Sequence, residues 1–368
     1  MPGRLAMRTT RWRALIMKAS KLLPACLMAC VMGMSFGARA EAMDLPVEGE
    51  MPSFKGATGW LDAQPLTPAE LRGKVVLVDF WTYSCINSIR QLPYLRAWAR
   101  KYKDQGLVVI GVHSPEFAFE KNPDNVRQAL KDLRVGAPIA TAIDSDHGVW
   151  LDFNNEYWPA IYLVDARGRI RHHVFGEGEY EQTERVIQQL LTEAGARNVD
   201  QALVVGDGRG IEAAPDLANL KSPETYVGSE RAENFVSKGG RLFSSRSVYA
   251  APDSLSLNHW ALVGDWTIGK HSAVLNTVGG RIVYRFHARD LHLVMGPREN
   301  GSAVRFRVLI DGKPPGAAHG IDVDAQGNGT LFAQRLYQLI RQAEPITDRE
   351  FEIEFLDAGA EAFVFTFG

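Results

Sequence analysis

The stretch VVLVDFWTYSCINSIRQLPYL, residues 75–95, decides the fold of this chain. Its first seven residues form an apolar run interrupted only by Asp79, which is typical of a strand buried in a parallel sheet. After Cys85, apolar side chains recur at helical spacing, at Ile86, Ile89, Leu92, Leu95 and Trp98. The sequence therefore predicts a buried strand that leads into a helix, with a cysteine where the helix begins.

Strands and helices continue to alternate as far as residue 195. The predicted strands are 107–114 and 140–144, the predicted helices are 122–135 and 179–195, and 160–175 reads as a hairpin turning at residues 166–168. Gly195 is the expected stop of the last helix. Such alternation predicts an α/β layer, and we assign it residues 41–196.

The character of the sequence changes after a linker predicted at residues 197–222. Short alternating segments with turn signals follow, for example RFRVLIDGKPP at 305–315 and EFEIEF at 350–355. Evenly spaced short strands with few helical patterns are typical of an all-β sandwich. We therefore expect a jelly-roll-like β-sandwich over residues 223–368.

Residues 1–40 read as a secretory signal peptide. A basic leader precedes an apolar run of about 16 residues, too short for the roughly 20 of a spanning helix, and Ala38-Arg39-Ala40 forms an A-x-A cleavage site. Cleavage after Ala40 predicts an exported, periplasmic protein. A lipoprotein signal ending at Cys30 is the alternative.

Loss of this leader changes the charge and the cysteine count. The leader holds seven Lys and Arg and no acidic residue, so the remaining chain carries 34 basic against 43 acidic residues, a formal net charge of −9. Such a negative charge does not favour binding to nucleic acid. Of the three cysteines only Cys85 remains, so it forms no internal disulfide and is either buried and inert or reactive toward another molecule.

The surroundings of Cys85 favour the reactive reading. A cysteine in the first turn of a helix meets unpaired N–H groups and the positive end of the helix dipole, so we expect a lowered thiol pKa. Asp79, inside the apolar strand, is a candidate proton shuttle, with a satisfied buried carboxylate as the alternative. Pro93 kinks the helix, and Pro159 directly before a strand is consistent with a cis bond in a tight turn.

These features together resemble the thioredoxin superfamily. The segments WTYSCINSIRQLPYL, EYWPAIYLVDARGRIRHHVFGEGEY and SPETYVGSERAENF are similar to the exported part of the DipZ family, within the TlpA-like redoxin branch. The resemblance covers roughly residues 45–368 and implies a thioredoxin-like domain followed by a sandwich resembling carbohydrate-binding modules. It also implies that Cys85 attacks disulfides and that Pro159 helps hold the substrate chain. Trp81 and Trp158 are candidate substrate contacts, with packing around the site as the alternative.

The chain departs from this family where a second cysteine is expected, because Ser88 stands there. A serine hydroxyl cannot release a mixed disulfide as a second thiolate does, although it can donate a hydrogen bond to the Cys85 thiolate. The sequence therefore predicts a monothiol C-x-x-S site that forms mixed disulfides with protein thiols, protein disulfides or small thiols. Whether such a protein turns over as an enzyme stays open, as does a membrane redox partner.

Two other functions stay open at this level. One is a one-cysteine peroxidase, because Thr82 lies three residues before Cys85. The other is a redox-inactive thioredoxin-fold scaffold whose sandwich binds a glycan or a protein, with Tyr226, Trp260 and Trp266 either stacking on sugar or lying in the core. No cofactor and no metal site are expected, since the histidines lack a closed ligand set.

Overall fold

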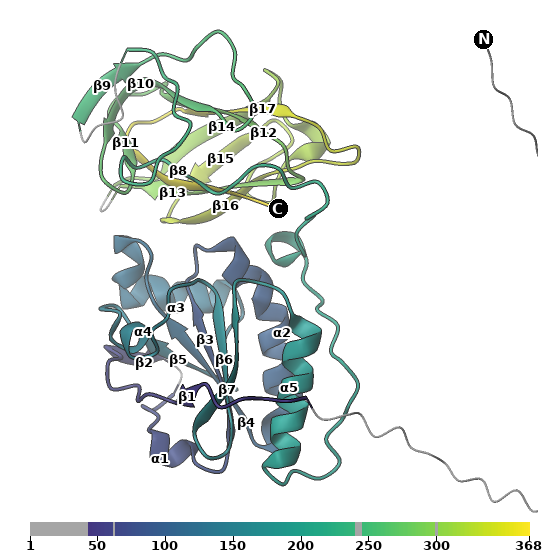
Figure 1. Ribbon diagram of the computed structural model, residues 1–368. Helices are drawn as coiled ribbons and strands as arrows, with labels where there is room; N and C mark the ends of the chain where they lie inside the picture. Colours follow the sequence, from purple (N-terminus) through teal and green to yellow (C-terminus); the bar gives the residue numbers. More distant parts are fainter. Residues whose placement is uncertain (1–42, 62, 240–244, 299–300) are drawn as a thin grey trace, which may run out of the picture. The chain divides into compact units, whose positions relative to one another are not determined.

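The computed structural model describes residues 43–368 except 62, 240–244 and 299–300. The predicted signal peptide therefore lies outside the described residues. Residues 43–368 cluster into one unit. We call residues 43–196 the α/β half and residues 223–368 the β half (Figure 1). Among the helices described, none has the length and apolar character to cross a bilayer.

The α/β half is built on a seven-stranded sheet in the order β1-β7-β6-β3-β4-β5-β2. Its strands are β1 (Gly49–Glu50), β2 (Gly59–Leu61), β3 (Val75–Trp81), β4 (Leu107–His113), β5 (Ile139–Ile143), β6 (Ala160–Val164) and β7 (Arg169–Phe175). Its helices are α1 (Pro68–Leu71), α2 (Ile86–Tyr102), α3 (Pro123–Asp132), α4 (Gly148–Asp152) and α5 (Tyr180–Glu193), with the 3-10 turns η1 (Lys103–Gln105) and η2 (Ala118–Lys121). Central β3 pairs parallel with β4 and antiparallel with β6.

Both faces of this sheet are covered, as a strand that is apolar on both sides requires. On one face Leu77 belongs to the same buried cluster as Trp98 of α2, while on the other Val78 clusters with Val149 of α4. Helices α2 and α5 lie side by side (Figure 1), and the Tyr102 hydroxyl donates to the Glu184 carboxylate over 2.6 Å. Cys85 therefore follows a strand whose seven residues are all buried.

The β half is all-β, as the sequence predicts. Its strands are β8 (Thr225–Tyr226), β9 (Ser245–Tyr249), β10 (Trp260–Ile268), β11 (Ala273–Leu275), β12 (Arg281–Phe286), β13 (Asp290–Pro297), β14 (Val304–Ile310), β15 (Asn328–Leu331), β16 (Arg335–Arg341), β17 (Arg349–Phe355) and β18 (Ala360–Phe367), with the 3-10 turn η4 (Gly316–Ala318). The first part of β10 pairs with β12, and the part from Gly264 onward pairs with β9 and β11. Gly264 has φ +97°, so this change of partner occurs at a residue without a Cβ.

The interior of the β half corrects one hypothesis about glycan binding. Trp260 and Trp266 are both fully buried, and their indole N–H groups donate to the carbonyls of Glu233 and Val263. A sugar stacks only on an exposed ring, so these two tryptophans are core residues and form no stacking face with Tyr226.

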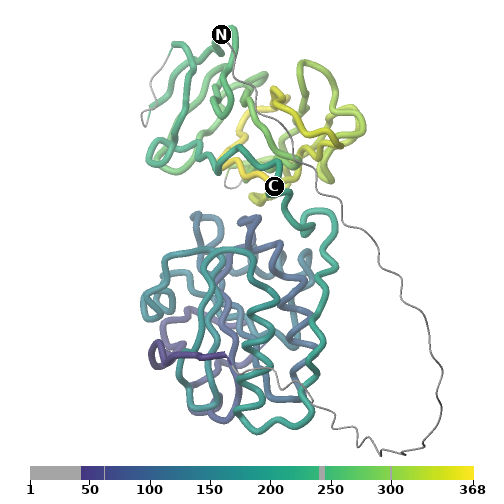
Figure 2. Tube along the Cα trace, turned by 45° about the vertical axis from the view of Figure 1, so that its right-hand side comes forward, coloured from purple at the N-terminus to yellow at the C-terminus, as the bar shows by residue number. Residues whose placement is uncertain are grey.

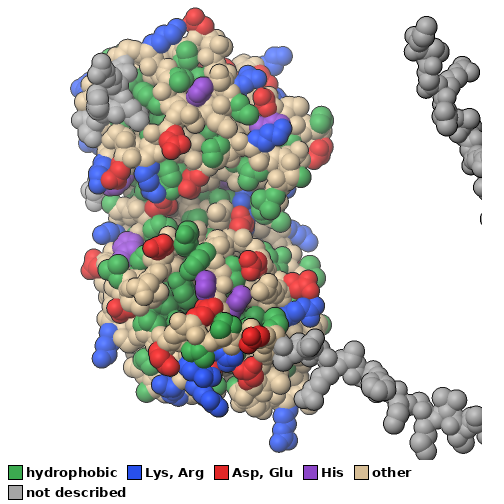
Figure 3. Space-filling view, in the orientation of Figure 1, with side chains coloured by type: hydrophobic (Ala, Val, Ile, Leu, Met, Phe, Trp, Pro, Cys, Tyr) green, Lys and Arg blue, Asp and Glu red, His purple; other side chains and the backbone are tan. Residues whose placement is uncertain are grey.

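The two halves share part of one apolar core. The cluster around α2 also contains Val294, Leu336, Phe363 and Val364 of the β half. Figure 2 follows the chain between the halves through residues 197–222, where the described structure holds only the short turn η3 (Gly210–Glu212). On the face shown in Figure 3, acidic and basic side chains are interspersed over both halves.

Candidate functional site

Cys85 is the N-cap residue of α2. Its backbone is extended (φ −85°, ψ 117°), its carbonyl accepts from the Ile89 amide over 3.0 Å, and its side chain caps no helix N–H group. The thiol is free and half-buried. Cys85 thus stands immediately before the helix, one residue earlier than the first-turn position that the sequence suggests.

The pKa of Cys85 moves in the opposite direction to the one expected from the helix dipole. The pKa of the thiol is raised to about 12, first by burial and also by the charges of Glu116 and Glu224, while the amide and hydroxyl of Ser88 act to lower it. The expectation of a lowered pKa is therefore wrong for this conformation, because desolvation and two carboxylates outweigh the helix terminus.

Ser88 lies in the first turn of α2 and faces the thiol. It is 1% exposed, and within the described structure its hydroxyl makes no hydrogen bond of ordinary geometry. A buried hydroxyl without a partner is costly unless a ligand completes it. The group on which this hydroxyl acts is the Cys85 thiol, whose pKa it lowers.

Asp79 lies in the core of the sheet, and burial raises its pKa to about 8. Its carboxyl accepts a 2.7 Å hydrogen bond from the Gln91 side chain, which opposes that shift. At neutral pH the group is mostly protonated, so it takes a proton from Cys85 only in alkaline solution. Its part as a proton shuttle stays a prediction.

Pro159 and Trp158 lie at the same edge of the sheet as the end of β3. The Trp158–Pro159 bond is cis, and the register pairs Phe80 with Ala160, the residue after the proline. The Trp158 indole donates to the Ser114 carbonyl over 2.9 Å. Trp81 is 1% exposed and packs edge-on against the His113 ring, so it lies in the core. Substrate contact by Pro159, Trp158 or Trp81 stays a prediction.

Glu120 organises the loop before Cys85, and sequence reasoning missed it. It is fully buried, and one of its oxygens accepts from the hydroxyls of Thr82 (2.5 Å) and Ser84 (2.6 Å). Its other oxygen accepts from the amides of Glu116 (2.7 Å) and Phe117 (2.9 Å). Burial raises the pKa of Glu120 to about 7. The only signal for it in the sequence is a glutamate that follows Phe117 and Phe119 and precedes the next helix.

The β half adds further residues to this region. The Tyr226 hydroxyl lies 2.7 Å from Glu116 and 2.9 Å from Glu224, and Arg231 forms a 2.9 Å ion pair with Glu116. The Arg231 guanidinium also lies over the Tyr226 ring, 3.5 Å from its centroid. These contacts connect the segment 224–231 to the loop that follows β4.

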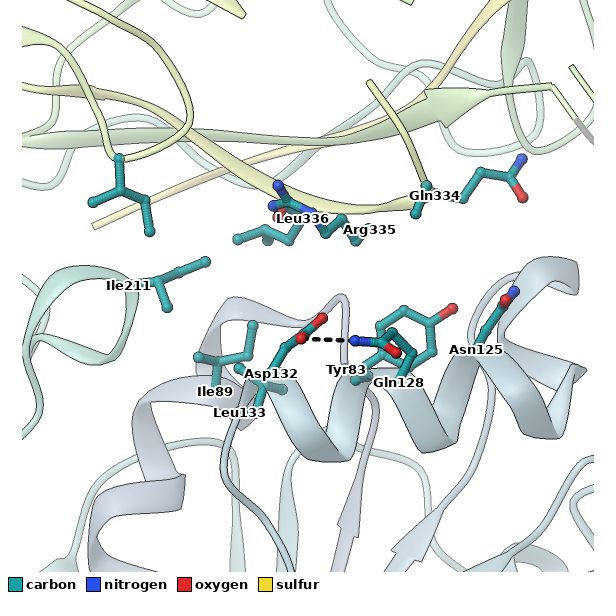
Figure 4. Close-up of a pocket in the computed structure, with 13 residues that line it drawn as sticks. Tyr83, Ile89, Asn125, Gln128, Asp132, Leu133, Ile211, Gln334, Arg335 and Leu336 are labelled. Carbon is teal, nitrogen blue, oxygen red and sulfur yellow. Dashed lines mark hydrogen bonds between the residues drawn. The ribbon is translucent and has the colours of Figure 1, made fainter. Parts of the chain in front are cut away.

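A cavity of about 340 Å³ lies between the halves, next to the loop before Cys85. Figure 4 shows Leu336 and Arg335 of β16 facing Ile89 of α2 across it, with Tyr83 on its floor. Tyr83 is 5% exposed, and its hydroxyl makes no hydrogen bond of ordinary geometry among the described residues. The cavity is mainly apolar, so it does not by itself indicate a polar ligand.

The comparisons with known proteins cover both halves. A Redoxin family model matches residues 46–191, and a model described as "Thioredoxin like C-terminal domain" matches residues 222–368. Protein DipZ of Mycobacterium bovis is 40% identical over 271 residues, which are 72% of this chain and 37% of DipZ. The chain thus spans 37% of the length of that relative.

Two proteins that are similar to the α/β half match it over almost their whole length. Thiol-disulfide oxidoreductase YkuV of Bacillus subtilis is 30% identical over 143 residues, which are 39% of this chain and 95% of YkuV. The solution structure of a thioredoxin-like protein in the oxidized form is 29% identical, with a TM-score of 0.36, and the match covers 39% of this chain and 96% of that chain. This chain belongs to the thioredoxin-like redoxin family.

Proposed function

We propose that this protein is an exported thiol–disulfide exchange protein whose Cys85 acts as a single reactive thiol. The observation that carries the proposal is the position of Cys85, at the N-cap of α2 directly after β3, with a buried serine hydroxyl where a dithiol site has its second sulfur. Family membership and the likeness to YkuV and DipZ support thiol–disulfide chemistry at this position.

The reaction open to a single thiol is formation of a mixed disulfide. The Cys85 thiolate attacks one sulfur of R–S–S–R, the Cys85–S–S–R bond forms, and R–S⁻ leaves and takes up a proton. One disulfide is consumed and one is formed. Ser88 supplies no second thiolate, so a thiol from another molecule must release the adduct.

Direct detection of the mixed disulfide tests the proposal. We expect residues 41–368, incubated with bis(2-hydroxyethyl) disulfide or oxidised glutathione, to gain one adduct that maps to Cys85 by mass spectrometry and is removed by dithiothreitol. The Cys85→Ala variant should gain none. If the wild-type protein forms no adduct with either disulfide, the proposal is wrong.

One observation favours a second function, a redox-inactive scaffold. The raised pKa of Cys85 keeps the thiol protonated at neutral pH in this conformation, and a thiol reacts far more slowly than its thiolate. We expect alkylation by iodoacetamide to accelerate about tenfold per pH unit through pH ~10. An alkylation rate that does not rise with pH over this range would show that the thiol is inaccessible and would favour the scaffold.

The peroxidase alternative is less well supported by the geometry. The Thr82 hydroxyl donates to the buried Glu120 carboxylate over 2.5 Å, so it is not free to hold a peroxide beside Cys85. Rapid formation of a sulfenic acid at Cys85 with hydrogen peroxide is the observation that would reinstate this alternative.

A further inference from the structure

Two carboxylates from different halves of the chain meet at one hydroxyl. Glu116 follows β4, and Glu224 lies in the β half directly before β8. Their carboxylate oxygens lie 2.7 and 2.9 Å from the Tyr226 hydroxyl, whose single hydrogen is shared between them. The Glu116 side chain is mostly buried, whereas Glu224 is exposed and available to an approaching molecule.

This pair is tied to the thiol through Glu120. One carboxylate oxygen of Glu120 accepts from the Ser84 amide over 3.3 Å, and the other accepts from the Glu116 amide over 2.7 Å. A single buried side chain therefore holds the residue before Cys85 and the backbone of Glu116 side by side. The electrostatic effect of both Glu116 and Glu224 on the Cys85 thiol agrees with this placement.

Nearby cations compensate only part of this charge. Arg231 pairs with Glu116 over 2.9 Å, and Lys270 pairs with Glu230 over 2.8 Å. One arginine against two carboxylates leaves about one negative charge in the cluster. Like-charged molecules are repelled from such a position and oppositely charged ones are attracted.

A second observation concerns the polar side chain beside the thiol. The Ser88 hydroxyl beside Cys85 is 1% exposed and has no partner of ordinary geometry among the described residues. A sulfur or carbonyl of a bound substrate would give this hydroxyl an acceptor.

We infer that Glu116 and Glu224 form an acidic pair that selects, for exchange with Cys85, disulfides flanked by positive charge over those flanked by negative charge. The inference rests on the proposed function, since it names the substrate class of the same thiol. It also makes the β half part of the site, because Glu224 and Tyr226 come from it.

Three small disulfides of different charge test the inference. Cystamine is cationic, 3,3′-dithiodipropionate is anionic and bis(2-hydroxyethyl) disulfide is neutral, and each leaves an adduct of different mass on Cys85. The rates of adduct formation with cystamine and with dithiodipropionate are each divided by the rate with the neutral disulfide. This division cancels any change in the fraction of Cys85 that is ionised. We expect the wild-type protein to prefer cystamine over dithiodipropionate by about tenfold, less in high salt.

Charge-removing variants test whether the preference for cystamine comes from Glu116 and Glu224. Glu224→Gln keeps an oxygen that can accept from Tyr226 and removes the charge, so we expect the preference to fall about three- to tenfold, and Glu116→Gln should act in the same direction. Glu230→Gln is the matched control, because Glu230 lies in the same segment and pairs with Lys270. Circular dichroism should show that all three variants are folded.

The outcomes separate the inference from the proposed function. If the neutral disulfide adds to Cys85 but Glu224→Gln has the same charge preference as Glu230→Gln, the inference is overturned and thiol exchange stands. If none of the three disulfides adds to Cys85, the proposed function is overturned and the inference falls with it.

Discussion

At the scale of single residues, one oxygen atom limits the chemistry that we propose for this protein. Ser88 occupies the position from which a second sulfur would resolve a mixed disulfide, and its hydroxyl is buried facing Cys85. Serine and cysteine differ little in size, so the site should accept a sulfur without rearrangement.

Ser88→Cys should therefore create a dithiol site. We expect this variant to form an internal disulfide under air and to accelerate the reduction of insulin by dithiothreitol. The wild-type protein should not accelerate that reduction. Thiol titration before and after reduction measures the bond. Asn87→Cys is the control, because a sulfur two residues from Cys85 has poor geometry for closure. Equal behaviour of the two variants would contradict the prediction.

Asp79 should make the protein less stable as the pH rises. Its pKa is raised from an ordinary value of 3.8 to about 8, so the folded state holds a proton that the unfolded chain releases between these values. The stability from this group is complete below pH ~4 and is lost as the pH approaches ~8. Between pH ~5 and ~8, wild type should lose at least about 1 kcal/mol more unfolding free energy than Asp79→Asn.

Urea unfolding at both pH values measures this difference. The raised pKa of Glu120 acts in the same direction in both proteins and cancels in the comparison. Asp124→Asn, at a side chain that is 85% exposed, should follow the wild-type profile. Parallel profiles for wild type and Asp79→Asn would show that the carboxyl is already ionised in the folded protein.

At the scale of elements, a buried carboxylate joins the loop before α2 to the loop after β4. Removal of the Glu120 side chain by Glu120→Ala leaves five donors without their acceptor, two hydroxyls and three amides. Each buried donor left unsatisfied costs about 1–3 kcal/mol, partly relieved by entering water. We expect a loss of about 2–4 kcal/mol of unfolding free energy.

Chemical denaturation checks this loss against a surface control. Glu181→Ala removes an exposed glutamate that pairs with Arg185, and such a pair contributes about 0–1 kcal/mol. If Glu120→Ala costs no more than Glu181→Ala, the Glu120 network does not stabilise the fold.

Local patterns in the sequence predicted the long elements and missed the short ones. The apolar run of β3 and the helical spacing in α2 and α5 are signals of many residues, and the structure contains each of them. Strand β2 has three residues and helix α4 has five, too few for a period to show. Their positions depend on pairing and packing with distant parts of the chain.

The pKa of Cys85 was harder still to predict from local patterns, because it depends on residues far away in the sequence. A cysteine at a helix start predicts a lowered pKa when only its own helix is considered. Glu224 is 139 positions away in the sequence and acts on the thiol only because the β half is folded against the α/β half. The Glu120 network likewise joins segments that no local pattern connects.

At the scale of the whole molecule, an aromatic contact connects the halves. Phe363 of β18 packs 5.1 Å from the Phe117 ring and 4.9 Å from the Phe119 ring, measured between centroids, and is 5% exposed. The rings it meets come from the loop that also carries Glu116 and Glu120. The β half thus supports the loop beside Cys85 from outside the α/β half.

Phe363→Ala should therefore destabilise both halves together. Removing a buried phenylalanine costs about 3–5 kcal/mol, and we expect faster hydrogen exchange in both β3 and β10. Phe332→Ala is the control, since that ring is 77% exposed. Faster exchange confined to strands of the β half would show that the two halves unfold independently.

The shared aromatic cluster has a consequence for how such proteins diversify. A hybrid gene that joined this α/β half to the β half of a relative would have to carry matching residues at 117, 119 and 363. Substitutions at these three positions should therefore be correlated across natural sequences, and chimeras that ignore the correlation should express poorly.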